Sequence, residues 1–337
     1  MSQHRPARAS VFSAGSWGTA LAKIMADAGT DVVMHARRSE IADAITTAHR
    51  NPGYFPDIEL PHTVTATTDP TVALGGADFL LLSIPAQSLR ANLAAWAPHI
   101  GPETLIVSLM KGIEQGSKLR ASQVITEVTG VSADRVAVLS GPNLAPEIMG
   151  GQPAAATIAC PDEDAARRFQ QVCRTPYFRP YTSIDVVGCE LGGAVKNVIA
   201  LAVGISSGMG LGDNAAALLI ARGLAETTRL AVAMGACPAT LAGLSGLGDL
   251  VASCTSPLAR NRTFGVHLGR GLSVEEATAA TRQTTEGVKS AEAVLDLART
   301  RGVEMPIAEV ISALLNDKIT LAETAAALMQ RPPKPER

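Results

Sequence analysis

The first half of the chain alternates short apolar runs with longer stretches in which apolar residues recur at helical spacing. The runs are almost uninterrupted, as is typical of strands buried on both faces of a sheet. Strands are predicted at residues 9–12, 31–36, 64–66, 78–84, 104–109, 136–139, 153–159 and 177–181, and helices at 20–28, 87–97, 119–128 and 162–173. This alternation predicts a parallel sheet with helices on both faces.

From about residue 192 the pattern is helical only. Helices are predicted at residues 215–234, 273–281, 289–300, 306–315 and 320–329. No strand precedes the glycines of 204–212, so we interpret this stretch as a connection between helices, with Asp213 or Asn214 as the N-cap. We interpret residues 244–250 as a glycine-rich break that contains an acid, Asp249.

A glycine-rich turn joins the first strand to the first helix. It reads Ser13-Ala14-Gly15-Ser16-Trp17-Gly18, close to the G-x-G-x-x-G template of dinucleotide sites, with Ser13 in place of the first glycine. Gly15 lets the backbone approach a pyrophosphate, and Gly18 lets the helix pack on the sheet. The alternative is an ordinary glycine-rich turn between a strand and a helix.

The predicted fold class is therefore α/β, with an N-terminal Rossmann-like doubly wound parallel sheet followed by an all-α C-terminal domain. We expect the dinucleotide-binding domain to span residues 1–189 and the helical substrate domain 190–330. The tail, 331–337, carries three prolines among charged residues, and we expect it to be disordered.

The second predicted strand ends at Arg37-Arg38, where an NAD-selective site usually has an acidic residue for the ribose 2′-hydroxyl. Arginines there favour a 2′-phosphate, so we expect NADP(H), or both NADP(H) and NAD(H), as cofactor. A solvated basic turn is the alternative.

Composition narrows the class of protein further. The 337 residues are 47% hydrophobic and only 3% aromatic, and the formal net charge of −2 gives no general attraction to nucleic acid or membranes. No apolar stretch is long enough for a membrane span. Five widely spaced cysteines without a C-x-x-C pair indicate neither a metal site nor a disulfide framework, and reduced thiols favour a cytoplasmic protein.

Lys196 interrupts an otherwise apolar helical stretch. A lysine beside a core is either a snorkelling side chain at a domain edge or an acid/base whose pKa is lowered by partial burial. Polar groups that suit a small phosphorylated substrate also follow predicted strands or helical breaks, namely Lys111, Asn143, Asp249, Arg260 and Asn261. Together they predict a nicotinamide-dependent dehydrogenase that acts on a small anionic carbonyl or alcohol.

Five motifs in order resemble the bacterial type of NAD(P)-dependent glycerol-3-phosphate dehydrogenase. They are residues 14–22 (AGSWGTALA), 140–143 (SGPN), 190–197 (ELGGAVKN), 246–250 (GLGDL) and 260–262 (RNR). The resemblance covers residues 11–286. It implies the interconversion of dihydroxyacetone phosphate and sn-glycerol 3-phosphate, which supplies the backbone of phospholipids.

The resemblance also implies roles for individual residues. Lys196 matches the family's proton acceptor and donor. Its substrate contacts match Lys111, Gly141, Asn143, Lys196, Asp249, Ala259, Arg260 and Asn261, and its cofactor contacts match Gly15, Ser16, Trp17, Gly18, Arg37, Arg38, Lys111, Ala145, Arg260, Thr284 and Glu286. Glu286 has a second interpretation, as a carboxylate that stabilises a helix N-terminus.

Two residues depart from the family pattern. Ser13 replaces a glycine in the pyrophosphate turn, and Ala259 replaces a serine, which removes a hydroxyl but leaves a backbone contact. A β-hydroxyacid or 6-phosphogluconate type dehydrogenase is the nearest alternative, and an inactive cofactor-sensing protein is the alternative from another class. The expected partners are a small phosphorylated substrate and, as an open alternative to the monomer, a second copy of the chain.

Overall fold

The computed structural model describes residues 5–281 and 286–329, and its chain divides into two compact units. Unit 1 comprises residues up to Met110 together with Leu119–Glu190, and unit 2 comprises Lys111–Lys118 and the chain from Leu191 onward. The short segment Lys111–Lys118 thus groups with the helices, although it lies between two strands in the sequence. The predicted tail at 331–337 lies outside the described residues.

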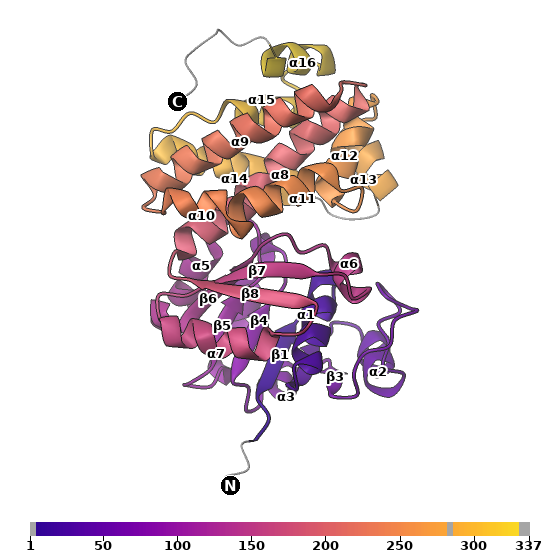
Figure 1. The fold of residues 1–337 in the computed structure, drawn as a ribbon, viewed down its shortest axis with the longest axis vertical. Helices are drawn as coiled ribbons and strands as arrows, with labels where there is room; N and C mark the ends of the chain where they lie inside the picture. The colour runs from indigo at the N-terminus through magenta and orange to yellow at the C-terminus, as the bar shows by residue number, and fades with distance from the viewer. Residues whose placement is uncertain (1–4, 282–285, 330–337) are drawn as a thin grey trace. The chain divides into compact units, whose positions relative to one another are not determined.

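Unit 1 is a single twisted sheet with the strand order β3-β2-β1-β4-β5-β6-β7-β8 (Figure 1). The strands are β1 (Arg8–Phe12), β2 (Asp31–His35), β3 (Val64–Thr67), β4 (Phe79–Leu82), β5 (Leu105–Ser108), β6 (Val136–Ser140), β7 (Ala154–Ala159) and β8 (Phe178–Ser183). The first six have the doubly wound order, which confirms the predicted fold class. All neighbours are parallel except β6 and β7, which pair antiparallel through Leu139 and Ile158.

Helices cover both faces of this sheet because successive side chains of each strand point to opposite sides. On one face Val11 and Leu81 belong to a core with α1, α2, α6 and α7, and on the other Phe12 and Leu82 belong to a core with α3, α4 and α5. The helices are α1 (Ser16–Asp27), α2 (Ser39–Thr47), α3 (Pro70–Leu74), α4 (Leu89–Trp96), α5 (Ala121–Thr129), α6 (Ala145–Met149) and α7 (Glu163–Cys173).

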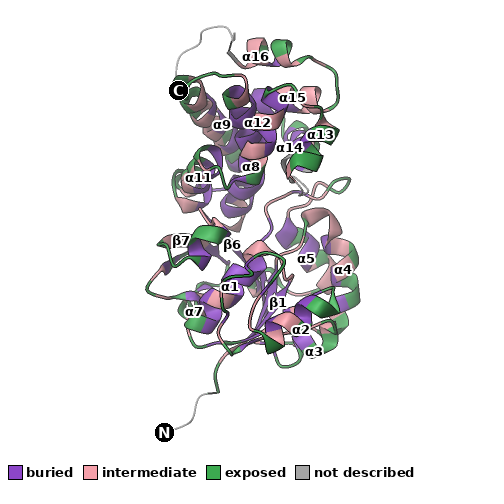
Figure 2. Ribbon diagram, turned by 90° about the vertical axis from the view of Figure 1, so that its right-hand side faces the viewer, coloured by how far each residue is buried: buried purple, intermediate pink, exposed green. Residues whose placement is uncertain are grey.

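Unit 2 is helical and is built around α8 (Val186–Gly208), which begins in unit 1. Every residue of 188–206 is buried, and Figure 2 shows buried residues in purple in the helical unit around α8. Within the described residues it is the one helix long and apolar enough to cross a membrane, but most of it lies inside the fold, as in a core helix. The others are α9 (Asp213–Ala233), α10 (Pro238–Ala242), α11 (Asp249–Thr255), α12 (Arg260–Gly269), α13 (Val274–Thr281), α14 (Glu286–Thr300), α15 (Pro306–Leu315) and α16 (Leu321–Met329).

The predictions about the glycine-rich stretches were wrong in part. Gly210 and Gly212 lie in the connection between α8 and α9, as predicted. Gly204 and Gly208 lie inside α8, where they let its backbone touch that of α12: a Cβ on either would lie 2.2–2.3 Å from a carbonyl oxygen of α12. The N-cap of α9 is Gly212 rather than Asp213 or Asn214. The stretch 244–250 is not a break either, since Leu244–Gly248 forms a π-helical turn that runs directly into α11.

Candidate active site

The structure brings the predicted catalytic lysine together with an acid in unit 2. Lys196 lies in the third turn of α8 and is only 8% exposed. Its Nζ donates hydrogen bonds to Asp249 Oδ1 at 2.5 Å and to Ser253 Oγ at 2.7 Å. Asp249 begins α11 and Ser253 follows one turn later, so both face the lysine from the same side of that helix.

Asp249 is itself shared between two lysines. Its Oδ2 accepts a hydrogen bond from Lys111 Nζ at 2.6 Å, and the residue is 1% exposed. Asn197, the residue after Lys196, donates from Nδ2 to the carbonyl oxygen of Lys111 at 3.0 Å and holds that segment in place. One carboxylate therefore faces two ammonium groups, and the cluster is left with a net positive charge when all three residues are ionised.

This surrounding lowers the pKa of Lys196 from its ordinary value of 10.5 to about 8. Burial is the main cause, because removing water disfavours the ammonium form. Asp249 raises the pKa and so opposes burial, whereas the nearby charge of Lys111 lowers it further. A lysine with a pKa close to neutral exchanges its proton readily, which is the property required of a general acid/base.

The neighbouring thiol shows how dry this region is. Cys254, on α11 beside Ser253, has a pKa raised to about 12, chiefly by burial. All five cysteines are free. Among the described residues, no group of three or more His, Cys, Asp or Glu side chains is arranged to hold a metal ion.

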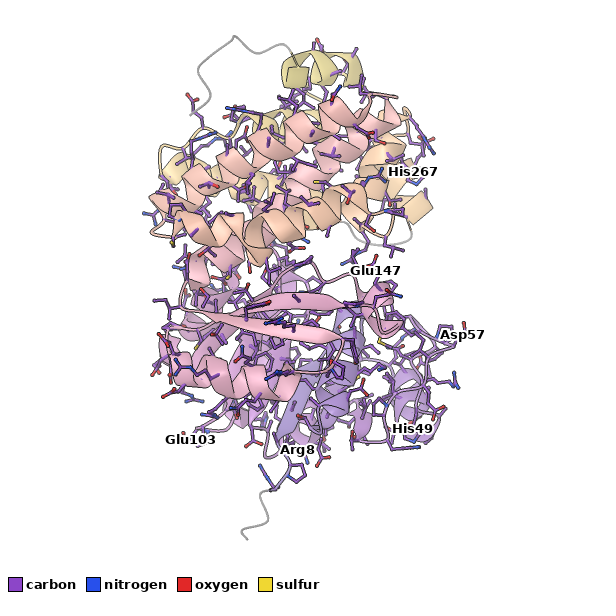
Figure 3. The ribbon with its side chains drawn as sticks, viewed as in Figure 1. Arg8, His49, Asp57, Glu103, Glu147 and His267 are labelled. Carbon is purple, nitrogen blue, oxygen red and sulfur yellow. The ribbon has the colours of Figure 1, made fainter. Side chains whose placement is uncertain are left out.

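The predicted phosphate-binding residues lie at the start of α12. Ala259 is its N-cap and is 8% exposed, while Arg260 is exposed and Asn261 partly buried. His267, labelled in Figure 3, marks the last turn of the same helix. Among the described residues, Arg260 takes no part in the cluster of Lys196, Asp249 and Lys111, and its exposed guanidinium remains available to an anion.

The predicted cofactor turn lies at the carboxyl end of β1 in unit 1. Gly18 packs so closely that a Cβ there would lie 2.3 Å from the carbonyl oxygen of Ser13. Ser13 has a φ of +146°, a region that side chains rarely adopt, and its Oγ accepts a hydrogen bond from Gly15 N at 3.1 Å. The serine thus adopts a backbone conformation that favours glycine and adds a hydrogen bond inside the turn.

Asn51, which no sequence motif singled out, holds this turn from outside. It is 1% exposed, and its Nδ2 donates to Ala14 O at 2.9 Å and to Thr19 Oγ1 at 2.8 Å. Its segment lies between α2 and β3, where Figure 3 labels His49 and Asp57. Folding brings this amide to the turn from more than thirty residues away, so no local sequence pattern predicts the contact.

Other predicted cofactor residues occupy the edges of the same unit. Ser16 and Trp17 begin α1, and the indole Nε1 of Trp17 is buried without a partner among the described residues. Arg37 and Arg38 follow β2 and are exposed, and Arg38 forms a weak ion pair with Glu40 at 3.4 Å. Exposed guanidiniums at this position fit a 2′-phosphate.

The Ser140-Gly141-Pro142-Asn143 motif follows β6. Gly141 has a φ of +154°, and a Cβ there would lie 2.9 Å from the Cα of Ala156 on β7, so only glycine fits. Asn143 presents both amide atoms, buried and without a hydrogen-bond partner in the described chain. Ala145 then begins α6, on which Figure 3 labels Glu147. A buried amide without partners is expected where a ligand supplies them.

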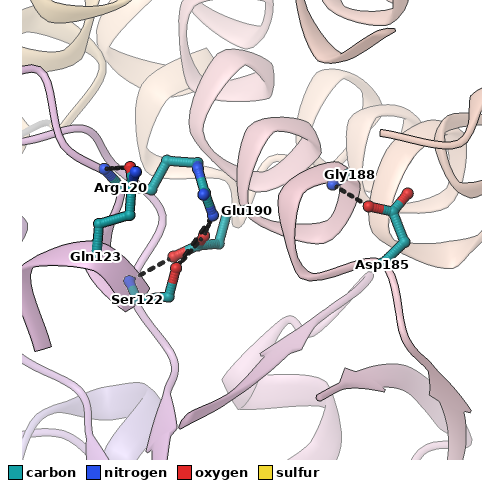
Figure 4. Close-up of polar contacts among 6 residues, drawn as sticks. All are labelled: Arg120, Ser122, Gln123, Asp185, Gly188 and Glu190. Carbon is teal, nitrogen blue, oxygen red and sulfur yellow. Dashed lines mark hydrogen bonds and ion pairs between the residues drawn. The ribbon is translucent and has the colours of Figure 1, made fainter. Parts of the chain in front are cut away.

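Glu190, the first residue of the ELGGAVKN motif, has a structural role that sequence reasoning missed. Figure 4 shows its carboxylate held by the Arg120 guanidinium and by Ser122, whose N donates to Oε1 and whose Oγ donates to Oε2, both at 2.7 Å. These residues form the start of α5. The site-residue prediction also includes Thr284 and the side chain of Glu286, which lie outside what the structure describes.

A doubly wound sheet with a glycine turn after its first strand, joined to helices that carry a buried lysine with a near-neutral pKa, is the arrangement of a nicotinamide-dependent dehydrogenase. The comparisons with known proteins identify the family within that class. Models of the NAD-dependent glycerol-3-phosphate dehydrogenase N-terminus and C-terminus match residues 8–166 and 185–326. The chain belongs to this family.

Individual relatives agree with the family models. The glycerol-3-phosphate dehydrogenase [NAD(P)+] of Streptomyces griseus is 60% identical over 332 residues, which cover 98% of this chain and 99% of the relative. That of Thermobifida fusca is 59% identical, with 98% of each chain covered. The crystal structure of glycerol-3-phosphate dehydrogenase from Coxiella burnetii superposes with a TM-score of 0.92 at 34% identity and covers 97% of this chain and 99% of that one.

Proposed function

We propose that this protein reduces dihydroxyacetone phosphate to sn-glycerol 3-phosphate with NADPH or NADH, and that Lys196 transfers the proton. The observation that carries the proposal is the burial of Lys196 in a cluster with Asp249 and Lys111, because burial, with the nearby charge of Lys111, lowers the pKa of the lysine to about 8. Family membership supplies the substrate pair. The product is the backbone of glycerophospholipids, so we place the enzyme in their synthesis.

Bound nicotinamide supplies the hydride for the ketone carbon. The chain's own residues would then stabilise the negative charge that develops on the ketone oxygen. Protonated Lys196 donates to that oxygen as it gains alkoxide character, and in the reverse direction neutral Lys196 accepts the alcohol proton. Asp249 and Ser253 hold the ammonium in one orientation, so the proton is delivered along a fixed direction.

Four polar residues would take part in recognition of the anion. Arg260 can grip a phosphate through two parallel hydrogen bonds, and Asn261 lies beside it. Asn143 offers a donor and an acceptor that lack partners among the described residues. Lys111 adds a second positive charge next to Lys196. These groups favour a phosphorylated substrate over a neutral one.

The turn from Gly15 to Gly18 fits a dinucleotide, because it combines closely packed backbone with the N-terminus of α1. Arg37 and Arg38 would hold the 2′-phosphate of NADP(H), and the resemblance adds Ala145, Thr284 and Glu286 to the cofactor contacts. We further propose a cytoplasmic location, on the ground of five free thiols, and a homodimer as the assembly to test first.

A side-by-side assay tests the proposed function. Purified protein is given dihydroxyacetone phosphate, a β-hydroxyacid and 6-phosphogluconate with either cofactor, and Lys196→Ala is measured beside the parent. We expect activity on dihydroxyacetone phosphate only, and a loss of turnover on the order of 10²–10⁴-fold in Lys196→Ala with cofactor binding intact. Cofactor binding without any turnover by the parent would favour the sensor alternative. Turnover of Lys196→Ala within a few-fold of the parent would make the lysine structural.

A further inference from the structure

The contact between Lys196 and Asp249 depends on a close approach of two backbones. One is that of α8 one turn before Lys196, and the other is that of the segment just before Asp249. Gly192 lies four residues before Lys196 on α8, so the two share a face of the helix. A Cβ on Gly192 would lie 2.3 Å from the carbonyl oxygen of Ser245 and 3.3 Å from the Cα of Gly246. Any side chain at residue 192 would therefore force the two segments apart.

Ser245 and Gly246 belong to the π-helical turn Leu244–Gly248, whose next residue is Asp249. The other side of this turn is equally constrained, since a Cβ on Gly246 would lie 2.0 Å from the carbonyl oxygen of Leu241 on α10. The turn is thus held between α8 and α10 by backbone contacts. Isolated π-turns in proteins frequently occur at functional sites.

We infer that Gly192 is a positioning residue for the proposed reaction: its contact with the π-helical turn sets the reach of Asp249 to Lys196. The inference rests on the proposed function, because it assumes that Lys196 transfers the proton. The hydrogen bond of Lys196 to Asp249 measures 2.5 Å, so a shift of the turn by about one ångström away from the lysine would stretch it beyond the usual range of a hydrogen bond.

The same helix offers a matched control. Gly208 lies three turns beyond Lys196, and a Cβ there would lie 2.3 Å from the carbonyl oxygen of Val266 on α12. Gly208→Ala thus creates the same clash as Gly192→Ala, between the same helix and a backbone oxygen, but away from the lysine. Loss of stability is common to both variants, whereas a change in proton transfer is expected only in Gly192→Ala.

The readout is the pH profile of turnover in the direction of glycerol 3-phosphate oxidation. Among the described residues, the titratable groups that face Lys196 are Asp249 and Cys254 on α11 and Lys111 on the segment before α5. Of these, Asp249 raises the pKa of the lysine. Moving Asp249 away should therefore shift the profile of Gly192→Ala to lower pH, and misplacement by about 1 Å should lower turnover on the order of 10²-fold.

In the experiment, Gly192→Ala, Gly208→Ala, Gly246→Ala and Lys196→Ala are compared with the parent for turnover, pH profile, KM for NADP+ and melting temperature. We expect the shifted pH profile in Gly192→Ala and also in Gly246→Ala, whose added Cβ would clash with α10 and displace the same π-helical turn. Gly208→Ala should keep the parent's profile, and all three should keep the parent's KM for NADP+.

Three outcomes test the inference separately from the function on which it rests. If Lys196→Ala retains turnover, Lys196 does not transfer the proton, and the part of the proposed function on which the inference rests is wrong. The inference is overturned if Lys196→Ala is inactive and folded Gly192→Ala keeps the parent's pH profile, because the glycine contact then serves packing alone. If Gly192→Ala does not fold, the pH profile of folded Gly246→Ala decides in the same way. Failure of both variants to fold, with Gly208→Ala folded, overturns it in the same way, because the contact is then needed for the fold itself.

Discussion

Replacing Asp249 by asparagine should make the stability of the helical unit depend on pH in a predictable way. Asp249 is 1% exposed and accepts hydrogen bonds from two ammonium groups at 2.5 and 2.6 Å. Removing one partner of a buried ion pair usually costs about 3–5 kcal/mol, because the remaining charge is buried without compensation. Lys196 can avoid this uncompensated charge by losing its proton.

The cost of that course follows from the pKa. At pH 7 a lysine with a pKa of about 8 requires about 1.4 kcal/mol to give up its proton. Without Asp249 the pKa falls further, because that carboxylate raises it. We therefore expect folded Asp249→Asn to contain neutral Lys196 well below pH 8, with a loss of stability at the lower end of the 3–5 kcal/mol range.

The sign of the pH dependence follows from proton counting. In the unfolded chain Lys196 keeps its ordinary pKa of 10.5 and stays protonated, whereas in the folded variant it is neutral. The unfolded state then binds more protons, so the stability of the variant rises with pH by about 1.4 kcal/mol per unit. The parent gains in this way only above pH 8. The deficit of the variant, which is its loss in free energy of unfolding relative to the parent, should thus shrink by more than about 1 kcal/mol between pH 6 and pH 8.

Urea unfolding at several pH values measures this deficit. Both tryptophans, Trp17 and Trp96, lie in unit 1, so circular dichroism at 222 nm is the better probe of the helical unit. Asp213→Asn is the control, because Asp213 is an exposed acid at the start of α9 and its removal should cost less than about 1 kcal/mol at every pH. A deficit of Asp249→Asn that stays constant from pH 6 to pH 8, or grows, would refute the assignment of the low pKa to Lys196.

Four further predictions use the same contacts. Oxidation of glycerol 3-phosphate requires neutral Lys196 and reduction requires its protonated form, so turnover should rise through about pH 8 in the first direction and fall through it in the second; profiles without opposite limbs contradict this. Ser13→Gly should be more stable than Ser13→Ala by about 1 kcal/mol or more in thermal unfolding, against the usual preference for alanine, because of the φ of +146°. Exchanging Arg37 and Arg38 for alanine should raise KM for NADPH far more than for NADH, and equal increases argue against 2′-phosphate recognition. Arg260→Ala should lower kcat/KM at least ~10-fold for dihydroxyacetone phosphate but hardly for unphosphorylated dihydroxyacetone, and equal losses would assign the arginine to the cofactor or the fold.

The local pattern of the sequence was enough for most of unit 1. Short runs of three to seven residues between helical stretches correctly predicted all eight strands. The signal is clearest for the central strands, because a strand buried on both faces needs apolar side chains on both sides. The pairing of β6 with β7 was a different matter. Their antiparallel contact depends on how the chain turns after Gly141, and the alternation of elements carries no information on that direction.

The glycines show where local reasoning fails. The sequence predicts Gly204 and Gly208 in a connection between helices, because no strand precedes these glycines, yet they lie inside α8. Glycine is required at both positions because the backbone of α12, some sixty residues later in the chain, packs directly against them. The π-helical turn before Asp249 was likewise interpreted as a break, because its glycines make sense only against Leu241 and α8.

By itself, then, the sequence determined the alternation of strands and helices, the glycine turn of the cofactor site, and a lysine that an apolar helix carries into a core. These features depend on residues within a few turns of one another. Tertiary structure alone decided that Lys196 meets Asp249, 53 positions away, and that Lys111 reaches the same carboxylate across 138. The pKa of the lysine follows from those contacts and from the exclusion of water around them, and neither exists until distant segments of the chain have packed together.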